Sequence, residues 1–427
     1  MEEGFEGLSQ SLSGLKRTFR SGKTRGVEWR KAQLRALLKF LAENEAQIFE
    51  ALKQDLGKHP IGVVKKSADH ALLHIQKWMA PKKGQLPLLL FPSRAQVLPE
   101  PLGTVLIFGS WNFPIIIDID TIKTQYLQSG LTLDPVLGAI SAGNTVVLKP
   151  SELAPTCSSL LKRTIPLYLD TEAVKVIEGG SDVAEQLLQQ RWDKIFFTVS
   201  AFSLAVAGSP RVGRIIMSAA AKHLTPVTLE LGGKCPVILD SFSGSDFKVA
   251  VKRIAGGKWG PCAGQACIGI DYVLVQQNLA PVLVESLKSC IKKFYGENVK
   301  TLQSICRIVN KHHFDRIRNL LEEPGVAASI VYGGSMDQDN FLYVIRCLFG
   351  GIGQSGFGRY HGNYSLDTFS HEKAVLHRTF FPEFEPRYPP WNDFKLDFIR
   401  LAYNLDYVGL LLLLLGLRRI FTPNRSR

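Results

Sequence analysis

A cysteine, a glutamate and an asparagine in this sequence have side chains and surroundings that suit covalent chemistry. Cys267 lies in AGQACIGIDYVL, where small neighbours leave room for the close approach of backbone, substrate and cofactor. Cysteine is partly ionised near neutral pH and strongly nucleophilic, so it can attack an aldehyde carbon and form a thiohemiacetal. By itself, a free cysteine is more often a packed core residue. The case for Cys267 therefore depends on the other two side chains.

Glu230 lies inside the apolar segment PVTLELGGK, just before a Gly-Gly turn. A carboxylate in an apolar strand is costly unless it is paired or functional, and burial raises its pKa toward the range of a general base. The alternative is a glutamate exposed at the end of a strand. Asn112, in GSWNFP (109–114), follows an apolar strand, and its amide can donate to a developing oxyanion. Such a contact contributes roughly 3 kcal/mol in favourable cases.

The segment VVLKPSE (146–152) indicates a binding site at the end of a strand. It places Lys149 and Glu152 at the carboxyl end, where the ribose hydroxyls of a dinucleotide can be held. The competing interpretation is a solvated strand end.

Short apolar runs alternate with stretches of helical periodicity, a pattern typical of buried parallel strands in an α/β fold. Residues 27–56 have helical spacing that Gly57 ends, and they predict an amphipathic helical start. The strand-like runs are TVLIF (104–108), TVVLK (145–149), VKVIE (174–178), KIFFT (194–198), PVILD (236–240) and YVLVQ (272–276). We therefore expect a doubly wound, Rossmann-like sheet that binds its ligand beyond the carboxyl ends of the strands, followed by a second α/β domain.

Composition narrows the class of protein. The chain has 427 residues, enough for two or three structural units, and a formal charge of +13. Nucleic acid is not the expected partner, because no long basic block or zinc-finger spacing accompanies the charge. Seven irregularly spaced cysteines indicate reducing conditions, and the acidic N-terminus lacks the apolar core of a signal peptide. Nothing in the sequence calls for a metal.

The C-terminal tail is strongly apolar but short. Residues 408–417 read VGLLLLLLGL, and apolar positions interrupted by charges precede them at 394–402. A spanning helix needs about 20 apolar residues, so this run suits an interfacial anchor. The alternative is a C-terminal helix that is buried or docked on a partner subunit.

The order and the sequences of these segments resemble those of the aldehyde dehydrogenase superfamily. PVTLELGGK, GQACIGIDYVL and FGRYHGNYSLDTFSHEK are similar to its class 3, fatty aldehyde dehydrogenase-like branch, and the resemblance extends from about Gly14 to about Lys373. It implies that Cys267 is the acylated nucleophile, that Glu230 activates it or the hydrolytic water, and that Asn112 with the Cys267 backbone N–H forms the oxyanion hole. The implied cofactor residues are Lys149 and Glu152 at the adenosine ribose, with Gly208, Ser209 and Gly213 in the turn that receives the pyrophosphate.

The resemblance also implies a reaction and its partners. Medium- or long-chain aliphatic aldehydes, with aromatic aldehydes as an open alternative, would be oxidised to carboxylic acids through a thioester on Cys267. NAD is the favoured cofactor and NADP stays open, because Glu152 favours a free 2′-hydroxyl only if it faces the ribose. Relatives of this class imply a homodimer. With the apolar tail, they also imply a place on the cytoplasmic side of the endoplasmic reticulum or another intracellular membrane.

We divide the chain accordingly into four parts. Residues 1–229 form the dinucleotide-binding domain, with bridging strands near 85–105, and residues 230–358 form a truncated catalytic domain. Residues 359–390 are a bridging or oligomerisation segment, and residues 391–427 are the amphipathic and apolar tail.

The sequence departs from the family pattern in block-like ways. Extra residues fill most of 115–132, beside the proposed oxyanion hole, and 199–207 split the phosphate-binding turn. After residue 344 the chain passes almost at once to 348–362, omitting several dozen residues that include a glutamate expected at the nicotinamide ribose. A shorter gap falls near residues 58–64. Two further interpretations therefore stay open: a catalytically impaired splice or gene-model form that acts as a membrane-associated or dimer-forming interaction protein, and a chain that does not fold stably.

Overall fold

The computed structural model of the chain describes residues 2–57, 66–84, 86, 93–115, 131–198, 210–240, 245–260, 262–267, 269–296, 305–330, 332, 356–357, 363–377 and 392–417. The chain divides into two compact units, Met1–Trp78 with Pro101–Ser370 and Met79–Glu100 with His371–Arg427. The domain boundaries predicted after residues 229 and 358 both fall inside the first unit. Backbone contacts therefore group the expected dinucleotide-binding and catalytic regions into one unit. The second unit joins most of the bridging strands near 85–105 to the C-terminal segments.

A six-stranded sheet forms the centre of the first unit. Its strands, in the order in which they pair, are β10 (Gly356–Phe357), β7 (Val227–Glu230), β6 (Lys194–Thr198), β3 (Thr104–Phe108), β4 (Thr145–Lys149) and β5 (Val174–Val176). All pairings are parallel except that of β10 with β7. The order reverses between β3 and β6, which is the switch point of a Rossmann-like sheet. The predicted fold class is confirmed.

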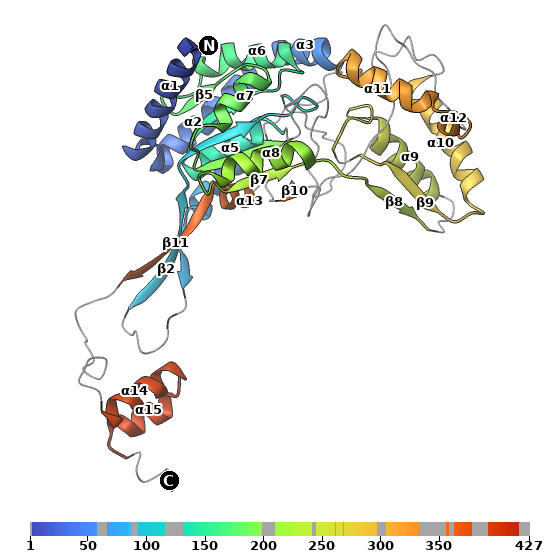
Figure 1. The fold of residues 1–427 in the computed structure, drawn as a ribbon. Helices are drawn as coiled ribbons and strands as arrows, with labels where there is room; N and C mark the ends of the chain where they lie inside the picture. The colour runs from blue at the N-terminus through green and yellow to red at the C-terminus, as the bar shows by residue number, and fades with distance from the viewer. Residues whose placement is uncertain are drawn as a thin grey trace. The chain divides into compact units, whose positions relative to one another are not determined.

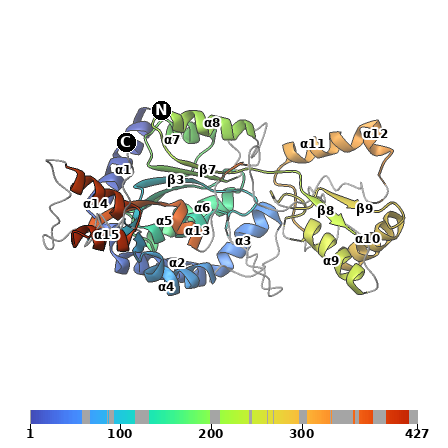
Figure 2. The same cartoon turned by 90° about the horizontal axis from the view of Figure 1, so that it is seen from below.

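Helices cover both faces of this sheet. Its strands are continuous apolar runs because side chains on both faces are buried. Figure 2 shows β3 and β7 between α7 (Ser181–Leu188) and α8 (Pro210–Ala221) on one side and α5 (Leu133–Ala142) and α6 (Pro155–Thr164) on the other. The N-terminal helix α1 (Glu2–Arg20) joins the first pair through Leu8, Leu12 and Leu15, which belong to one buried cluster with Phe108, Phe197 and Ile216. The core of the first unit is therefore built on both sides of the sheet.

The helical start predicted over residues 27–56 forms two helices, α2 (Val27–Glu43) and α3 (Glu45–Leu56). Asn44 separates them, and its amide Nδ2 donates to Phe40 O at 3.0 Å and to the Tyr168 hydroxyl at 2.9 Å. Gly57 ends α3 with a φ of 61°, a left-handed conformation that glycine adopts without strain. Helix α4 (Lys66–Trp78) follows.

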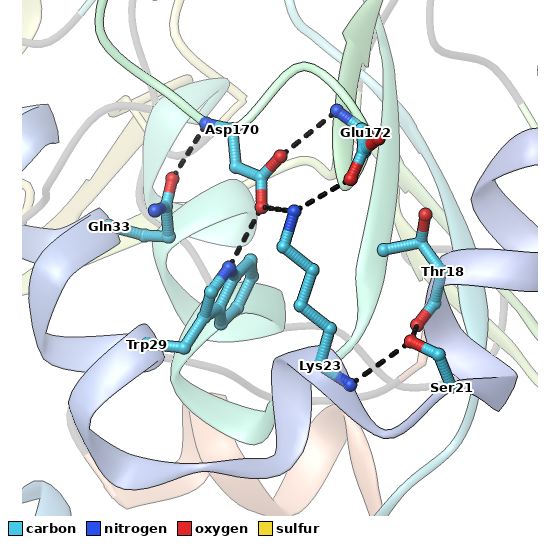
Figure 3. A network of polar contacts seen from close by, with 7 residues as sticks. All are labelled: Thr18, Ser21, Lys23, Trp29, Gln33, Asp170 and Glu172. Atoms are coloured by element: carbon cyan, nitrogen blue, oxygen red, sulfur yellow. Dashed lines mark hydrogen bonds and ion pairs between the residues drawn. The ribbon is translucent and has the colours of Figure 1, made fainter.

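A polar network fastens the N-terminal helices to the loop before β5 (Figure 3). The Lys23 ammonium, in a 3-10 turn (Lys23–Arg25), lies 2.8 Å from both Asp170 Oδ2 and Glu172 Oε2, and Trp29 Nε1 donates to Asp170 at 2.9 Å. Gln33 Oε1 accepts from the Asp170 backbone N–H at 2.8 Å. Although burial opposes it, hydrogen bonds from Lys23 and Trp29 lower the pKa of Asp170.

A smaller α/β region follows β7. Strands β8 (Pro236–Leu239) and β9 (Tyr272–Val275) pair in parallel, and α9 (Ser245–Trp259) and α10 (Ala280–Tyr295) pack with them around a small buried cluster (Figure 1). Helices α11 (Lys311–Glu322) and α12 (Pro324–Ala327) follow, and α13 (Asn363–Thr368) packs on α5. Within the described part of this region, the strands predicted over 236–240 and 272–276 are present.

The second unit contains a three-stranded sheet, in the order β1 (Lys82–Gly84), β2 (Arg94–Pro101) and β11 (Ser370–His377). It also contains two helices that pack on each other, α14 (Asp393–Tyr403) and α15 (Tyr407–Leu414), around Phe398, Leu401 and Leu413 (Figure 1). Within the described ranges, no helix has the length and apolarity needed to cross a bilayer.

Most of the residues on which the sequence departs from the family pattern lie outside the described part of the chain. This holds for 116–130 of the first extra block, for the second block at 199–207, for the junction at 344–348 and for 58–64.

Candidate active site

The turn after β3, residues 109–114, is held by hydrogen bonds from its backbone N–H groups to neighbouring segments. The Gly109 N–H donates to Lys149 O at 2.9 Å, and the Ser110 N–H donates to Thr132 Oγ1 at 3.2 Å. A Cβ on Gly109 would lie 2.7 Å from the Thr132 side chain, so only glycine fits this approach. Thr132 precedes α5, and the turn is therefore held between β4 and the start of that helix.

Asn112, in this turn, is fully buried and contacts the loop that carries the candidate nucleophile. Its amide Nδ2 donates to Gln265 O at 2.8 Å, and Cys262 Sγ donates to Asn112 O at 3.3 Å. Gln265 is two residues before Cys267, which is half-buried. The structure thus brings together the turn of Asn112 and the loop of Cys267, two predicted site segments that are far apart in the sequence. Cys262 was missed by sequence reasoning, and its only signal is a second cysteine in the same glycine-rich segment.

Glu230 is the last residue of β7 and is 3% exposed. Neither of its carboxylate oxygens has a hydrogen-bond partner among the described residues. Burial, with a smaller contribution from the charge of Asp134, raises the pKa of Glu230 well above its usual value. A raised pKa makes the ionised carboxylate a stronger base than an exposed glutamate, so that it can take a proton from a nucleophile or water.

Asp134 is a further candidate residue, which the sequence analysis did not single out. It is buried in the first turn of α5, two residues after the Thr132 that holds the 109–114 turn. Its signal was one charged residue in the otherwise apolar segment LDPVLGAISA. Because its charge reaches Glu230, the start of α5 connects the Asn112 turn with the end of β7.

Lys149 and Glu152 form an ion pair at the carboxyl end of β4. The Lys149 side chain is 1% exposed, whereas the Glu152 carboxylate is partly accessible. Their strand is next to the switch point of the sheet, where Rossmann-like folds bind dinucleotides. A buried ammonium that orients an accessible carboxylate fits the recognition of ribose hydroxyls.

Gly213 lies in α8, not in the turn before it. A Cβ there would lie 2.9 Å from Leu231 Cδ1 and 3.4 Å from Leu229 Cδ1, so glycine allows α8 to pack closely on β7 and on the residue that follows it. Close packing of helix on strand is one of the roles of glycine in dinucleotide-binding folds. Gly208 and Ser209 lie outside the described residues.

An aromatic pair, formed by the buried Trp111 and the half-buried His313, includes the neighbour of Asn112 in the sequence. The rings of Trp111 and His313 are stacked, with centroids 6.1 Å apart and planes 24° from parallel. Burial first, and then the charges of Arg316 and His312, lower the pKa of His313 to about 4. The imidazole is therefore neutral at physiological pH. No group of three or more His, Cys, Asp or Glu side chains in the described ranges is arranged to hold a metal ion.

Comparisons with known proteins identify the family of the chain. Residues 13–345 match the model of the aldehyde dehydrogenase family. The chain is 46% identical to aldehyde dehydrogenase family 3 member F1 of Arabidopsis thaliana, covering 98% of this chain and 100% of the relative. It is 32% identical to family 3 member A2 of Rattus norvegicus, with 95% and 97% covered. The Arabidopsis alignment extends over 508 residues, more than the 427 of this chain, so the relative carries segments that this chain lacks.

Among solved structures, substrate-bound AldH of Staphylococcus aureus is similar over 93% of this chain and 99% of its own, with 30% identity and a TM-score of 0.82. The fold, the buried carboxyl group and the Asn112 contact are thus accompanied by similarity along nearly the whole chain. The chain belongs to the class 3 branch of the aldehyde dehydrogenase family, whose members are NAD(P)-dependent enzymes that oxidise aldehydes to acids.

Proposed function

We propose that this chain oxidises medium- and long-chain aliphatic aldehydes, and aromatic ones more weakly, with Cys267 as the nucleophile and NAD as the preferred cofactor. The observation that carries the proposal is the hydrogen bond from Asn112 Nδ2 to Gln265 O, which holds an amide donor beside the Cys267 loop. The buried carboxyl group of Glu230 supplies a base of raised pKa in the same unit.

The roles follow from the chemistry of each side chain. The Cys267 thiolate adds to the aldehyde carbon, and the Asn112 amide with the Cys267 backbone N–H stabilises the oxyanion that forms. NAD, when bound, would supply the acceptor for the hydride of this carbon, and the oxidised product is a thioester on Cys267. Water then attacks the thioester while Glu230 takes its proton, and the carboxylic acid departs as the Cys267 thiol is restored. Glu230 is thus the base that makes the water nucleophilic.

The cofactor would be held at the carboxyl ends of β3, β4 and β6. Lys149 and Glu152 fit the hydroxyls of the adenosine ribose, and the negative charge of Glu152 disfavours a 2′-phosphate, which supports NAD over NADP. Gly213 supports the close approach of α8 to the sheet.

The apolar C-terminal tail supports the proposal that the substrate is apolar and derived from a membrane. Helix α15 has eight residues and is about 12 Å long, against a bilayer core of about 30 Å, so it suits a place within the membrane interface. Its apolar side chains are mostly exposed, including Val408 (69%), Leu411 and Leu414. We propose that α14 and α15 bind the cytoplasmic face of an intracellular membrane such as the endoplasmic reticulum. The alternative occupant is a partner subunit in a homodimer.

Activity is tested with the purified full chain, a fatty aldehyde and NAD, by NADH formation. Cys267→Ala should abolish turnover, whereas Cys290→Ala, a half-buried cysteine on α10, should leave it unchanged. Turnover that survives in Cys267→Ala would show that the nucleophile is another residue. A wild-type chain that is folded by circular dichroism but makes no NADH would support the catalytically impaired form instead.

Membrane binding is tested by flotation of the full chain with anionic liposomes. Replacing Leu411 and Leu414 by lysine should reduce the floated fraction several-fold, because both exposed leucines would enter the interface. Replacing the exposed Leu73 of α4 is the matched control. Equal flotation of both variants would overturn the membrane proposal. A loss of dimer mass on gel filtration in the lysine variant alone would assign the tail to subunit contact.

A further inference from the structure

The loop that carries Cys267 is fixed to a neighbouring segment by the side chain of Gln265. Its Nε2 donates to the backbone carbonyls of Arg307 at 2.7 Å and Cys262 at 3.2 Å, and its Oε1 accepts from the Val309 N–H at 3.0 Å. The donor and acceptor atoms of the amide are therefore both engaged with backbone. The loop position is set by the segment that contains residues 307 and 309.

The main chain of Gln265 sets the position of Asn112. The Gln265 carbonyl accepts from Asn112 Nδ2 at 2.8 Å, and the nearby Cys262 thiol donates to Asn112 O at 3.3 Å. Since one amide N–H of Asn112 points at this carbonyl, the plane of the amide follows the carbonyl. A shift of Gln265 would therefore turn the proposed oxyanion donor away from Cys267.

The backbone just before Gln265 needs such support. Ala263 has a φ of 47° and Gly264 a φ of 88°, both in the left-handed region, which an alanine rarely adopts. The Gln265 N–H closes a turn by donating to Cys262 O at 2.9 Å. Strained residues persist where surrounding contacts determine the conformation, and the Gln265 side chain provides such contacts.

The segment that receives Gln265 is itself fastened to the end of α3. The Arg307 N–H donates to Leu56 O at 2.7 Å, and its guanidinium donates to the carbonyls of Lys53 and Gln54. These groups are among the last carbonyls of the helix, and the Lys53 carbonyl also accepts the Gly57 N–H at 2.9 Å. Gln265 thus connects the nucleophile loop to a rigid helical element.

We propose that Gln265 is a positioning residue for aldehyde oxidation, which holds the Cys267 loop through its side chain and the Asn112 amide through its carbonyl. The inference rests on the proposed roles of Asn112 and Cys267. Only an amide supplies both the donor for Arg307 O and the acceptor for Val309 N. Glutamate keeps the acceptor but loses the donor, and methionine, of similar length, loses both.

The first test compares Gln265→Met with Gln33→Met in steady-state kinetics. Gln33 is a matched control, because its Oε1 also accepts a backbone N–H, that of Asp170, far from Cys267 in the sequence (Figure 3). We expect Gln265→Met to lower kcat about 10- to 100-fold with KM changed by less than about threefold, since an oxyanion contact is misplaced. Gln33→Met should leave both constants unchanged. Wild-type kcat in Gln265→Met would overturn the proposal.

A double variant separates positioning from a general loss of structure. If Gln265 acts through Asn112, then Asn112→Ala with Gln265→Met should be no slower than Asn112→Ala alone, because coupled residues are not additive. Losses that multiply would overturn the proposed route through Asn112.

Alkylation of Cys267 by iodoacetamide, followed by peptide mass spectrometry, tests the loop contact without turnover. Gln265→Met should change this rate at least about threefold, and Gln33→Met should not, because reactivity follows the local environment of the thiol. Equal rates in the two variants would overturn the role of Gln265, whatever the turnover. A wild-type chain without NADH formation, together with the altered alkylation rate, would count against the proposed function and leave the loop contact standing.

Discussion

The two α/β regions of the first unit differ in how their strands are covered. In the six-stranded sheet, every residue of β3, β4 and β6 is buried. In the two-stranded sheet, alternate residues are exposed, with Ile238 at 76% and Leu274 at 52%. Both sheets have apolar strands, so the difference lies in what covers them and not in the strand sequences.

The exposed face of the two-stranded sheet can be compared with the segments that this chain lacks relative to its relatives. Strands with apolar residues on both faces are typical of sheets covered on both sides. One face of β8 and β9 packs with α9 and α10, and Ile238 and Leu274 of the other are exposed. The Arabidopsis relative carries segments that this chain lacks. We propose that some of the segments that this chain lacks cover this face in the relative.

The largest expected effect contrasts a buried position of the six-stranded sheet with a half-exposed position of the two-stranded sheet. Phe196→Ala in β6 should lower the free energy of unfolding by about 4 kcal/mol, because a fully buried aromatic ring leaves a cavity. Leu274→Ala in β9 should cost less than about 1 kcal/mol, because half of the side chain is already in water. Urea titration measures both. Equal losses would mean that the two sheets are equally covered.

A buried lysine offers the next test. Burial lowers the pKa of Lys194 in β6 to about 8, from 10.5. The folded state therefore binds this proton less well than the unfolded state, and stability rises as the pH increases from 8 to 10.5. Lys194→Met should remove this rise and stabilise the chain at pH 7 by on the order of 2 kcal/mol. Urea unfolding across this pH range measures the effect. An equal rise in the free energy of unfolding of the wild type and of Lys194→Met would contradict the assignment.

Glu230 is the corresponding acidic group, at the end of β7. Because its pKa is raised in the folded state, the wild type should lose stability as the pH rises above 4.5 toward the folded-state pKa. Glu230→Gln should lack this loss, be more stable at neutral pH by roughly 1 kcal/mol, and lose turnover. Thermal unfolding across pH measures the first effect and NADH formation the second. A Gln variant with full turnover would remove Glu230 from the mechanism.

The smallest effect is expected on the exposed face of β8. Ile238→Thr should change the free energy of unfolding by less than about 0.5 kcal/mol, since the side chain is mostly in water. It should, however, reduce self-association in light scattering, because exposed apolar strands favour aggregation. A stability loss of several kcal/mol would show that another element covers this face.

Much of the fold could be predicted because strand sequences carry their own signal. The runs at 104–108, 145–149 and 194–198 are strands with those bounds, since apolar runs of this length fit a sheet covered on both faces. The helical pattern over 27–56 did not reveal the break at Asn44, because periodicity continues across a break that a side-chain amide stabilises.

The sequence by itself determined the residue types of the site: a cysteine among small residues, a carboxylate in an apolar strand, and an amide after a strand. The tertiary structure decided which of them meet. Asn112 and Gln265 are 153 residues apart and are joined by one hydrogen bond, and Asp134 acts on Glu230 across the fold. Local spacing encodes helices and strands, whereas contacts between distant residues depend on how the packed elements are placed.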